Sequence, residues 1–273
     1  MAGSPLVSIT IPSRNSEATI ALCLEGAVRQ SYPNLEVLLI DSHSTDKTKE
    51  VAAHYKARVI DCDGRLLAAR CLGVRESLGD YIVLVDTDLI LEATAIERAV
   101  NMMDKYDMLI LEEHSYNTNG FIPKLYSASK QIINSKLYWS FDPIKRIGNP
   151  PRFFKRELLE KAIAAIPQDL IPITVHYDHD IIYLESYKIS QRVGILPNAA
   201  FHIEPDWEKL WRTNFRYGAS LRELKKSGYY RELATKRGTG LSFGRPLRVG
   251  FQSLLLSLLL QSVQRIGYWF GSA

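Results

Sequence analysis

The sequence of 273 residues contains little cysteine: Cys23, Cys62 and Cys71 are its only three. No two of them have the CxxC spacing of common zinc and redox motifs, so the spacing disfavours a structural zinc site. An odd and sparse set also argues against a disulfide framework, and it is typical of proteins in a reducing compartment. We therefore expect a fold that depends on neither disulfides nor structural zinc.

The chain also lacks two nucleotide-binding motifs and a secretory leader. No GxGxxG follows the first expected strand and no GxxxxGK[ST] occurs, which disfavours a dinucleotide cofactor and P-loop chemistry. The first residues, Met1–Pro5, show no basic segment followed by an apolar one, so we expect no signal peptide.

The overall composition is that of a globular protein, but its charge is unevenly placed. Hydrophobic residues make up 46% and charged residues 23%, which excludes disorder and a pure coiled coil. The segment from Trp207 to Ala273 holds 12 lysine and arginine residues against three acidic ones, a net charge of +9, whereas residues 1–206 carry −5. This tail predicts an anionic partner, either nucleic acid or the polar face of a membrane.

Strand and helix patterns alternate along the first 112 residues, which predicts an α/β fold with right-handed crossovers and a mostly parallel sheet. From Glu113 to Pro172 the pattern weakens among turn-forming residues, and we expect an irregular region facing the substrate. The expected strands are 7–12, 35–40, 58–60, 81–85, 108–111 and 193–203, and the expected helices are 18–30, 46–56, 66–78, 94–105, 178–190 and 207–226.

The C-terminal stretch Val249–Phe270 has the pattern of an amphipathic helix. Its polar residues recur every four positions, and its apolar residues fall on the opposite side. Because a spanning helix needs about 20 predominantly apolar residues, we expect a helix lying at a membrane surface, with docking onto the protein's own core or a true span as alternatives. The polar series is Ser253, Ser257, Gln261 and Arg265; the apolar one is Leu255, Leu258, Leu259, Val263 and Ile266; and Arg245, Arg248 and Arg265 would meet phosphate head groups.

Nucleic acid is the less favoured partner, because the basic residues of the tail are interleaved with leucines and no nucleic-acid-binding motif occurs.

Polar residues follow three of the expected parallel strands, where open α/β sheets bind ligands. Pro12 to Asn15 follow the first strand, Asp41 to Ser44 follow the second, and Asp86-Thr87-Asp88 follow the strand at 81–85. Two carboxylates this close repel each other unless a cation lies between them, and hard divalent cations prefer carboxylate and phosphate oxygens. The alternative is that one aspartate caps the next helix and the other is solvated.

Several segments, in their order along the chain, resemble family-two glycosyltransferases with the GT-A fold. These segments are Val7–Asn15, Gln30–Val37, Ile40–Asp46, Ala69–Gly73 and Gly79–Asp88, and the resemblance extends over about residues 6–220. It implies a Rossmann-like GT-A domain over residues 1–218, and the charge and amphipathic pattern of the tail predict a basic, membrane-associating helical segment over residues 219–273.

The resemblance also implies a nucleotide-sugar donor, a divalent cation (Mn²⁺ or Mg²⁺) and inversion at the anomeric carbon. Ser42 replaces a second acidic residue that the family often has after Asp41, which leaves the donor base open. The residues implied to bind the donor are Pro12, Ser13, Arg14, Glu17, Asp41, Ser42, Arg65, Arg70, Asp86, Thr87, Arg212 and Arg216; those implied to bind the metal are Asp86, Asp88 and His202.

Asp178 matches the position of the family's catalytic base, at the start of an expected helix. A positioned carboxylate of this kind contributes about 10²–10⁴-fold to the rate. The alternative is that Asp178 only caps its helix. Trp207, Arg152 and Asp180 are expected on the acceptor side.

Together these features predict a metal-dependent, inverting glycosyltransferase at the cytoplasmic face of the cell membrane. The predicted acceptor is a lipid-linked glycan or a polyprenyl phosphate, and the predicted donor is GDP-mannose or a UDP-sugar. A loose likeness to dolichol-phosphate mannose synthases favours mannose. The alternatives are a nucleotidyltransferase with a similar sheet and a membrane-docked sugar-binding protein without catalysis.

Overall fold

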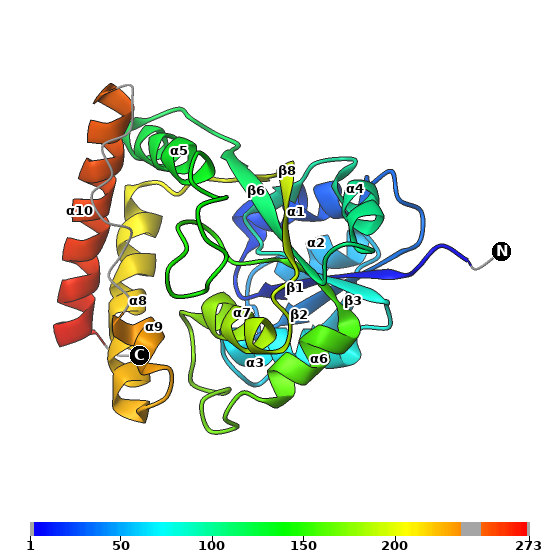
Figure 1. Ribbon diagram of the computed structural model, residues 1–273. Helices are drawn as coiled ribbons and strands as arrows, with labels where there is room; N and C mark the ends of the chain where they lie inside the picture. The colour runs from blue at the N-terminus through cyan, green and yellow to red at the C-terminus, as the bar shows by residue number, and fades with distance from the viewer. Residues whose placement is uncertain (1–2, 236–246, 272–273) are drawn as a thin grey trace.

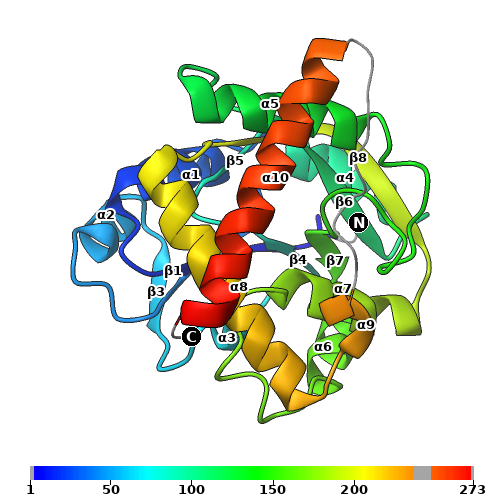
Figure 2. The ribbon, with the colours of Figure 1, turned by 90° about the vertical axis from the view of Figure 1, so that its left-hand side faces the viewer.

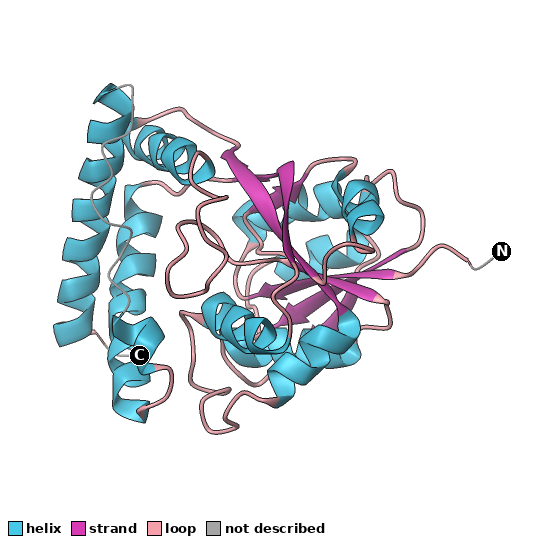
Figure 3. Cartoon of the chain, in the orientation of Figure 1, coloured by secondary structure: helices cyan, strands magenta, loops and turns pink. Residues whose placement is uncertain are grey.

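The computed structural model describes residues 3–235 and 247–271, and these residues form one sheet of eight strands with helices around it (Figure 1, Figure 3). The strand order is β3-β2-β1-β4-β7-β6-β8-β5. The strands are β1 (Val7–Ser13), β2 (Leu35–Asp41), β3 (Arg58–Asp61), β4 (Tyr81–Leu84), β5 (Leu89–Leu91), β6 (Met108–Ser115), β7 (Phe153–Lys155) and β8 (Val193–His202).

The helices cover both faces of this sheet. Apolar side chains of α1, α2 and α4 form one core layer with the strands, and those of α3, α6 and α7 form the other. The helices are α1 (Glu17–Val28), α2 (Thr48–His54), α3 (Leu66–Glu76), α4 (Ala95–Met102), α5 (Phe121–Asn134), α6 (Arg156–Ala164), α7 (Asp178–Ile189), α8 (Trp207–Ser227), α9 (Arg231–Thr235) and α10 (Leu247–Phe270).

The predicted alternation of strands and helices in the first half is confirmed. β1 pairs in parallel with both β2 and β4, and β2 pairs in parallel with β3. Ser13 lies opposite Asp41, and Thr10 lies opposite Leu84. The carboxyl ends of these strands therefore meet at one edge of the sheet, and the polar residues that follow them share that edge.

The prediction of an irregular region over residues 113–172 is wrong in part, because this region contains α5, β7 and α6. α5 buries Ile122, Leu125, Ala128 and Ile132, which recur at the three- and four-residue spacing of a helix. Pro123 lies in its first turn, where the backbone needs no amide hydrogen. The turn-forming residues on both sides obscure this periodicity in the sequence.

β7 is only three residues long, too short for a periodic pattern, and it inserts antiparallel between β4 and β6. β5 is the second antiparallel strand, and it pairs with β8 at one edge of the sheet. The sheet is mostly parallel, as predicted, with these two short exceptions.

The last long helix crosses α8 and α5 on one side of the molecule (Figure 2). At the crossing with α8, an added Cβ on Gly267 would lie 2.0 Å from the backbone oxygen of Phe215, and one on Gly218 would lie 2.0 Å from that of Gln264. The two helices therefore touch backbone to backbone, which only glycine allows. The predicted domain boundary between residues 218 and 219 falls inside α8 and stays a prediction.

The two sides of α10 differ from the predicted assignment. Val263 is buried, and Leu255 and Leu259 pack into a cluster with α5 and α8, so docking onto the protein's own helices accounts for this side. Leu258 and Ile266, predicted on the same side, are instead exposed. Within residues 3–235 and 247–271, no helix combines the length and the apolar character required to cross a bilayer. Arg245 lies outside the described residues.

Candidate active site

The loops after β1 and β2 hold each other at the shared edge of the sheet. The amide of Asn15 donates to the hydroxyl of Ser44 at 2.8 Å, and the amide of Lys47 donates to Glu17 at 2.9 Å. Asp41 is fully buried and accepts a hydrogen bond from the amide of Ser44, also at 2.8 Å. These bonds give the predicted nucleoside loop a defined shape.

The centre of the site is a buried arginine between two acidic residues. Arg70, from α3, is 1% exposed, and it donates through Nε to Asp178 and through Nη2 to Asp86. Its remaining nitrogen, Nη1, is buried without a hydrogen-bond partner among the residues that the structure describes. The predicted base and the predicted metal-binding motif are thus joined by one guanidinium.

Burial alone would raise the pKa values of Asp86 and Asp178, because a low-dielectric environment disfavours a charged carboxylate. For Asp86 the guanidinium groups of Arg152 and Arg70 outweigh burial, and its pKa lies well below the ordinary value of 3.8. For Asp178 the guanidinium of Arg70 does the same, and its pKa is lowered. Both groups are therefore carboxylates at neutral pH.

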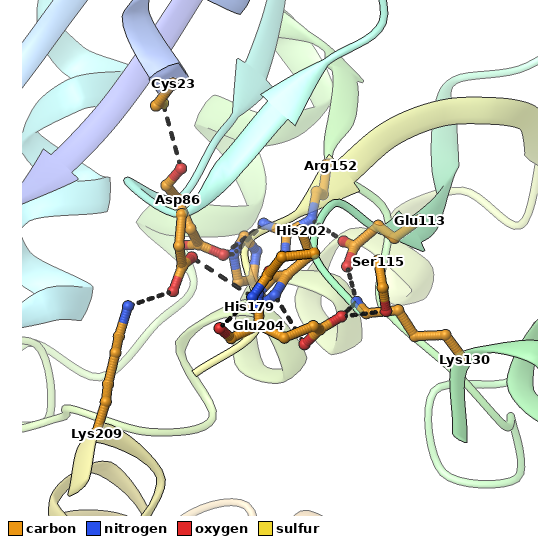
Figure 4. A network of polar contacts seen from close by, with 12 residues as sticks. Cys23, Asp86, Glu113, Ser115, Lys130, Arg152, His179, His202, Glu204 and Lys209 are labelled. Carbon is orange, nitrogen blue, oxygen red and sulfur yellow. Dashed lines mark hydrogen bonds and ion pairs between the residues drawn. The ribbon is translucent and has the colours of Figure 1, made fainter. Parts of the chain in front are cut away.

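The ion pairs continue from this centre as a chain of alternating charge (Figure 4). Arg152 contacts Asp86 and Glu113, both at 2.8 Å, and Lys130 lies 3.2 Å from Glu113 and 3.8 Å from Glu204. The pKa of Glu113 is lowered to about 2, since Arg152 and Lys130 outweigh the effect of burial. We call the following series the charge chain: Asp178, Arg70, Asp86, Arg152, Glu113, Lys130, Glu204, His202, Asp88 and Lys209.

The outer end of the charge chain has the donor set of a cation site. Nε2 of His202 lies 3.6 Å from Oδ1 of Asp88, and Nδ1 of the same ring lies 3.2 Å from the buried carboxylate of Glu204. Burial lowers the pKa of His202, but the carboxylates of Asp88 and Glu204 outweigh burial, and the pKa is raised. The electrostatic environment of the His202 ring therefore favours positive charge. A carboxylate behind a ligating histidine is a common second shell of metal sites.

Asp88 and His202 are the side chains that would hold a divalent cation at this point. Both oxygens of Asp86 are taken by Arg70 and Arg152, so the geometry favours Asp88 as the carboxylate ligand. The described residues contain no cluster of three or more His, Cys, Asp or Glu side chains that could hold a metal ion. A cation held by two protein ligands leaves positions for substrate phosphate, as is usual for Mg²⁺.

α8 contacts the site near its start and again near its middle. Nζ of Lys209 lies 3.2 Å from Asp88. Further along the helix, the ring of Tyr217 stacks on His176 with centroids 3.9 Å apart, and Ser220 accepts a hydrogen bond from the amide of His176. The helix therefore holds both the cation-site aspartate and the segment leading to Asp178.

Tyr177, directly before Asp178, adopts a left-handed backbone with φ of +70°. A bulky residue rarely adopts this conformation, and such strain concentrates at functional sites. The stacking of its neighbour His176 on Tyr217 is one contact that holds this turn in place.

The remaining predicted residues are placed as follows. Ser13 and Arg152 are buried, and the guanidinium of Arg152 is ion-paired to Asp86 and does not face solvent. Asp180 is ion-paired to Arg146. Trp207 is exposed at the start of α8, and Arg212 faces outward with Glu208, 3.7 Å away, as its ion-pair partner. Pro12, Arg14, Ser42, Arg65 and Thr87 lie at the ends of strands or in the loops that follow them, and Arg216 is exposed on α8.

The sequence analysis missed Glu113, Lys130, His179, Glu204 and Lys209. Glu204 could have been found, because His202 and Glu204 are two residues apart at the end of a strand, where alternate side chains share a face. Lys130 lies on α5, which was not predicted, and no local pattern marks Lys209.

Comparison with known proteins bears on this site. A model of the family described as Glycosyl transferase family 2 matches residues 8–163. An uncharacterized glycosyltransferase of Haemophilus influenzae is 32% identical over 142 residues, which are 47% of this chain and 55% of that protein. The chain thus spans about half the length of this curated relative.

Two solved structures share the architecture. TarS of Staphylococcus aureus (residues 1–349), in complex with UDP-GlcNAc, superposes with a TM-score of 0.60 at 16% identity, covering 94% of this chain and 81% of that one. The second is the mannosyltransferase PcManGT of Pyrobaculum calidifontis, in complex with GDP-Man and Mn²⁺. It superposes with a TM-score of 0.56 at 18% identity, covering 97% of this chain and 74% of that one. The predicted GT-A fold is confirmed.

Replacing Arg70 with methionine should destabilise the protein, because Asp178 then loses its buried counter-ion and Asp86 keeps only Arg152. We expect the free energy of unfolding to fall by about 3–5 kcal/mol at pH 7. Arg70→Lys should recover only part of this loss, since one ammonium cannot replace two separate nitrogens. Urea unfolding followed by circular dichroism measures both.

The matched control is Arg75→Met, which removes an exposed arginine from the same helix and should change stability by less than about 0.5 kcal/mol. Because the pKa values of both carboxyl groups are lowered, the stabilisation is present above their ordinary value of 3.8 and is lost as the pH falls through the lowered values. The difference between wild type and Arg70→Met should therefore shrink below about pH 4. Equal stability at pH 7 would show that Arg70 does not hold these carboxylates.

Proposed function

The chain belongs to glycosyl transferase family 2. On this premise we propose that it is a metal-dependent, inverting enzyme. It would transfer a sugar from a nucleotide-sugar donor to a lipid-linked acceptor at a membrane surface. The observation that carries the proposal is the joining of Asp178, the base, to the Asp86–Asp88 motif by Arg70 at the ligand-binding edge of the sheet.

The donor site is formed by the ends of β1, β2 and β4 and the loops that follow them. Solved structures of the same fold hold UDP-GlcNAc or GDP-Man, which supports a nucleotide-sugar donor without naming its base. We favour mannose as the transferred sugar, on the loose likeness to dolichol-phosphate mannose synthases.

Asp88 and His202 are proposed to hold Mn²⁺ or Mg²⁺, which when bound would neutralise charge developing on the diphosphate leaving group. The carboxylate of Glu204 lies 3.2 Å from Nδ1 of His202, on the side of the ring away from Asp88. Lys209 and Arg152 hold the neighbouring carboxylates and bring positive charge to the same edge.

Asp178 is proposed to take the proton from the attacking O–H of the acceptor, which is a sugar hydroxyl of a lipid-linked glycan or the P–OH of a monoanionic lipid phosphate. Arg70 contacts its Oδ2 and leaves Oδ1 to accept a proton. The oxygen of the acceptor then bonds to the anomeric carbon as the bond to the nucleoside diphosphate breaks on the opposite face. This order of bond making and breaking inverts the anomeric centre.

The lipid-linked acceptor and the membrane surface are supported by the outer side of α10. Leu247, Phe251, Leu258 and Trp269 recur on this side, and their side chains are 51–76% exposed. Arg248 and Arg265 are exposed on the same helix, where they can meet anionic head groups. An apolar face flanked by cations is typical of helices that lie in a membrane interface. We propose peripheral binding at the cytoplasmic face of the cell membrane.

Asp88→Ala should abolish the dependence on metal. Hydrolysis of GDP-mannose or a UDP-sugar, measured while Mn²⁺ is titrated, should fall by roughly 10²-fold or more at saturating metal, because Lewis-acid stabilisation is worth several kcal/mol. Asp104→Ala, which removes an exposed carboxylate after α4, is the control and should keep full turnover. Metal-stimulated turnover that survives in Asp88→Ala would remove Asp88 from the metal site.

Asp178→Asn should slow sugar transfer by about 10²–10⁴-fold while the dissociation constant of the donor stays within about twofold of wild type. Calorimetric titration of donor and a transfer assay with a membrane lipid extract separate the two effects. Asp169→Asn, at an exposed aspartate, should transfer sugar normally. Full transfer by Asp178→Asn would refute its role as the base.

Phe251→Ser combined with Trp269→Ser should weaken binding to vesicles containing phosphatidylglycerol by about tenfold or more, since about 1.4 kcal/mol corresponds to tenfold in affinity. Point variants are preferred to deletion, because α10 also covers α8 and α5. The control is Leu78→Ser, which removes a 64% exposed apolar side chain near the amino end of β4. Vesicle binding unchanged in the double variant would refute the membrane contact.

A further inference from the structure

A cavity lies between α5 and α10, beside the candidate active site. Its volume is about 380 Å³, within the usual range of small-molecule sites. Its floor contains Glu113, Arg152, His202 and Glu204, all members of the charge chain. A molecule in this cavity is therefore in contact with residues next to Asp86 and Asp88.

The cavity has an aliphatic side, formed by α5 and α10, and a polar side that includes the charge-chain residues. Leu254, Leu256 and Leu260 line it from α10, and Ile132 and Ile133 line it from α5. Burial of alkyl groups against such walls is worth about 25 cal/mol per Å² of apolar surface removed from water. The aliphatic side favours a hydrocarbon chain, and the charged and hydroxyl-bearing residues of the polar side favour a polar head group on the same molecule.

The cavity also has a cation that no carboxylate neutralises. Lys136 lines it at the end of α5, and its ammonium contacts the ring of Trp139 at 4.9 Å but forms no ion pair within the described part of the chain. Lys130, by contrast, is shared by Glu113 and Glu204. Ser253, Ser257 and Asn149 add polar groups along the lining. The free charge favours an anionic head group.

The same helix that lines the cavity carries the exposed apolar side described above. Leu256 and Leu260 face α5 and the cavity, whereas Phe251 and Leu258 face outward. A lipid at the outer side of α10 would therefore bind the same helix that lines the cavity beside the charge chain.

We infer that this cavity between α5 and α10 is the binding site for an alkyl or isoprenoid phosphate, with the chain against the leucines of α10 and the phosphate near Lys136. The inference rests on the proposed function, because it names the place where the lipid-linked acceptor binds. The part of α10 that forms it lies outside residues 8–163, which match the family model.

The test uses dodecyl phosphate, below its micelle concentration, as a soluble probe in calorimetric titrations of the full chain. Ser257→Trp places an indole in the cavity and should weaken binding of the probe at least tenfold. Ser262→Trp makes the same change at an exposed position of α10 and is the matched control, with unchanged binding expected. Lys136→Glu should weaken the binding of dodecyl phosphate and leave the binding of neutral dodecyl maltoside unchanged.

Inorganic phosphate alone should bind at least tenfold more weakly than dodecyl phosphate, since it lacks the chain. Equal affinity for the two would show a simple phosphate site and overturn the inference. Equal binding of dodecyl phosphate by wild type and Ser257→Trp would also overturn it. Normal binding of GDP-mannose or a UDP-sugar by Ser257→Trp shows that the variant is folded.

The proposed function has a separate test. It is refuted if the wild-type protein shows no metal-stimulated hydrolysis of the donor. If hydrolysis is present and dodecyl phosphate does not bind, the enzyme assignment stands and the cavity assignment is wrong.

Discussion

The structure of the site depends on one buried guanidinium, that of Arg70, which holds two carboxylates from distant parts of the chain. Desolvating three charged groups is costly, and removal of one partner leaves the others without compensation. The arginine therefore forces the loop after β4 and the start of α7 to stay together. In doing so it sets the position of Asp86, proposed to lie on the donor side, relative to Asp178, the proposed base.

The alternation of charge from Asp178 to Lys209 extends the same principle across the site. Every acidic group in this series has a basic neighbour within 4 Å, so each carboxylate of the charge chain is compensated by a cation or by His202. α8 closes the series at Asp88 and also supports the turn before Asp178 through Tyr217. Because α10 touches α8 backbone to backbone at Gly218 and Gly267, the helix proposed to meet the membrane is packed directly against the helix that supports catalysis.

Much of the fold and part of the site followed from local patterns. Strands with continuous apolar runs alternate with helices in the first half, and acidic residues follow the strand ends, so Asp41, Asp86 and Asp88 could be placed at one edge. α5 and β7 could not, because turn-forming residues surround the first and the second is three residues long. Lys130 and Lys209 were missed since their partners are 17 and 121 residues away, and no sequence spacing links them.

The sequence by itself determined the α/β class, the parallel order of the first strands and the family, because these depend on periodicity and on short motifs whose residues are neighbours along the chain. Only the tertiary structure decided that Asp86 is neutralised by two arginines, that His202 stands between Glu204 and Asp88, and which side of α10 is buried. Charge compensation and helix packing depend on distances between residues far apart in sequence, and those distances exist only once the chain has folded.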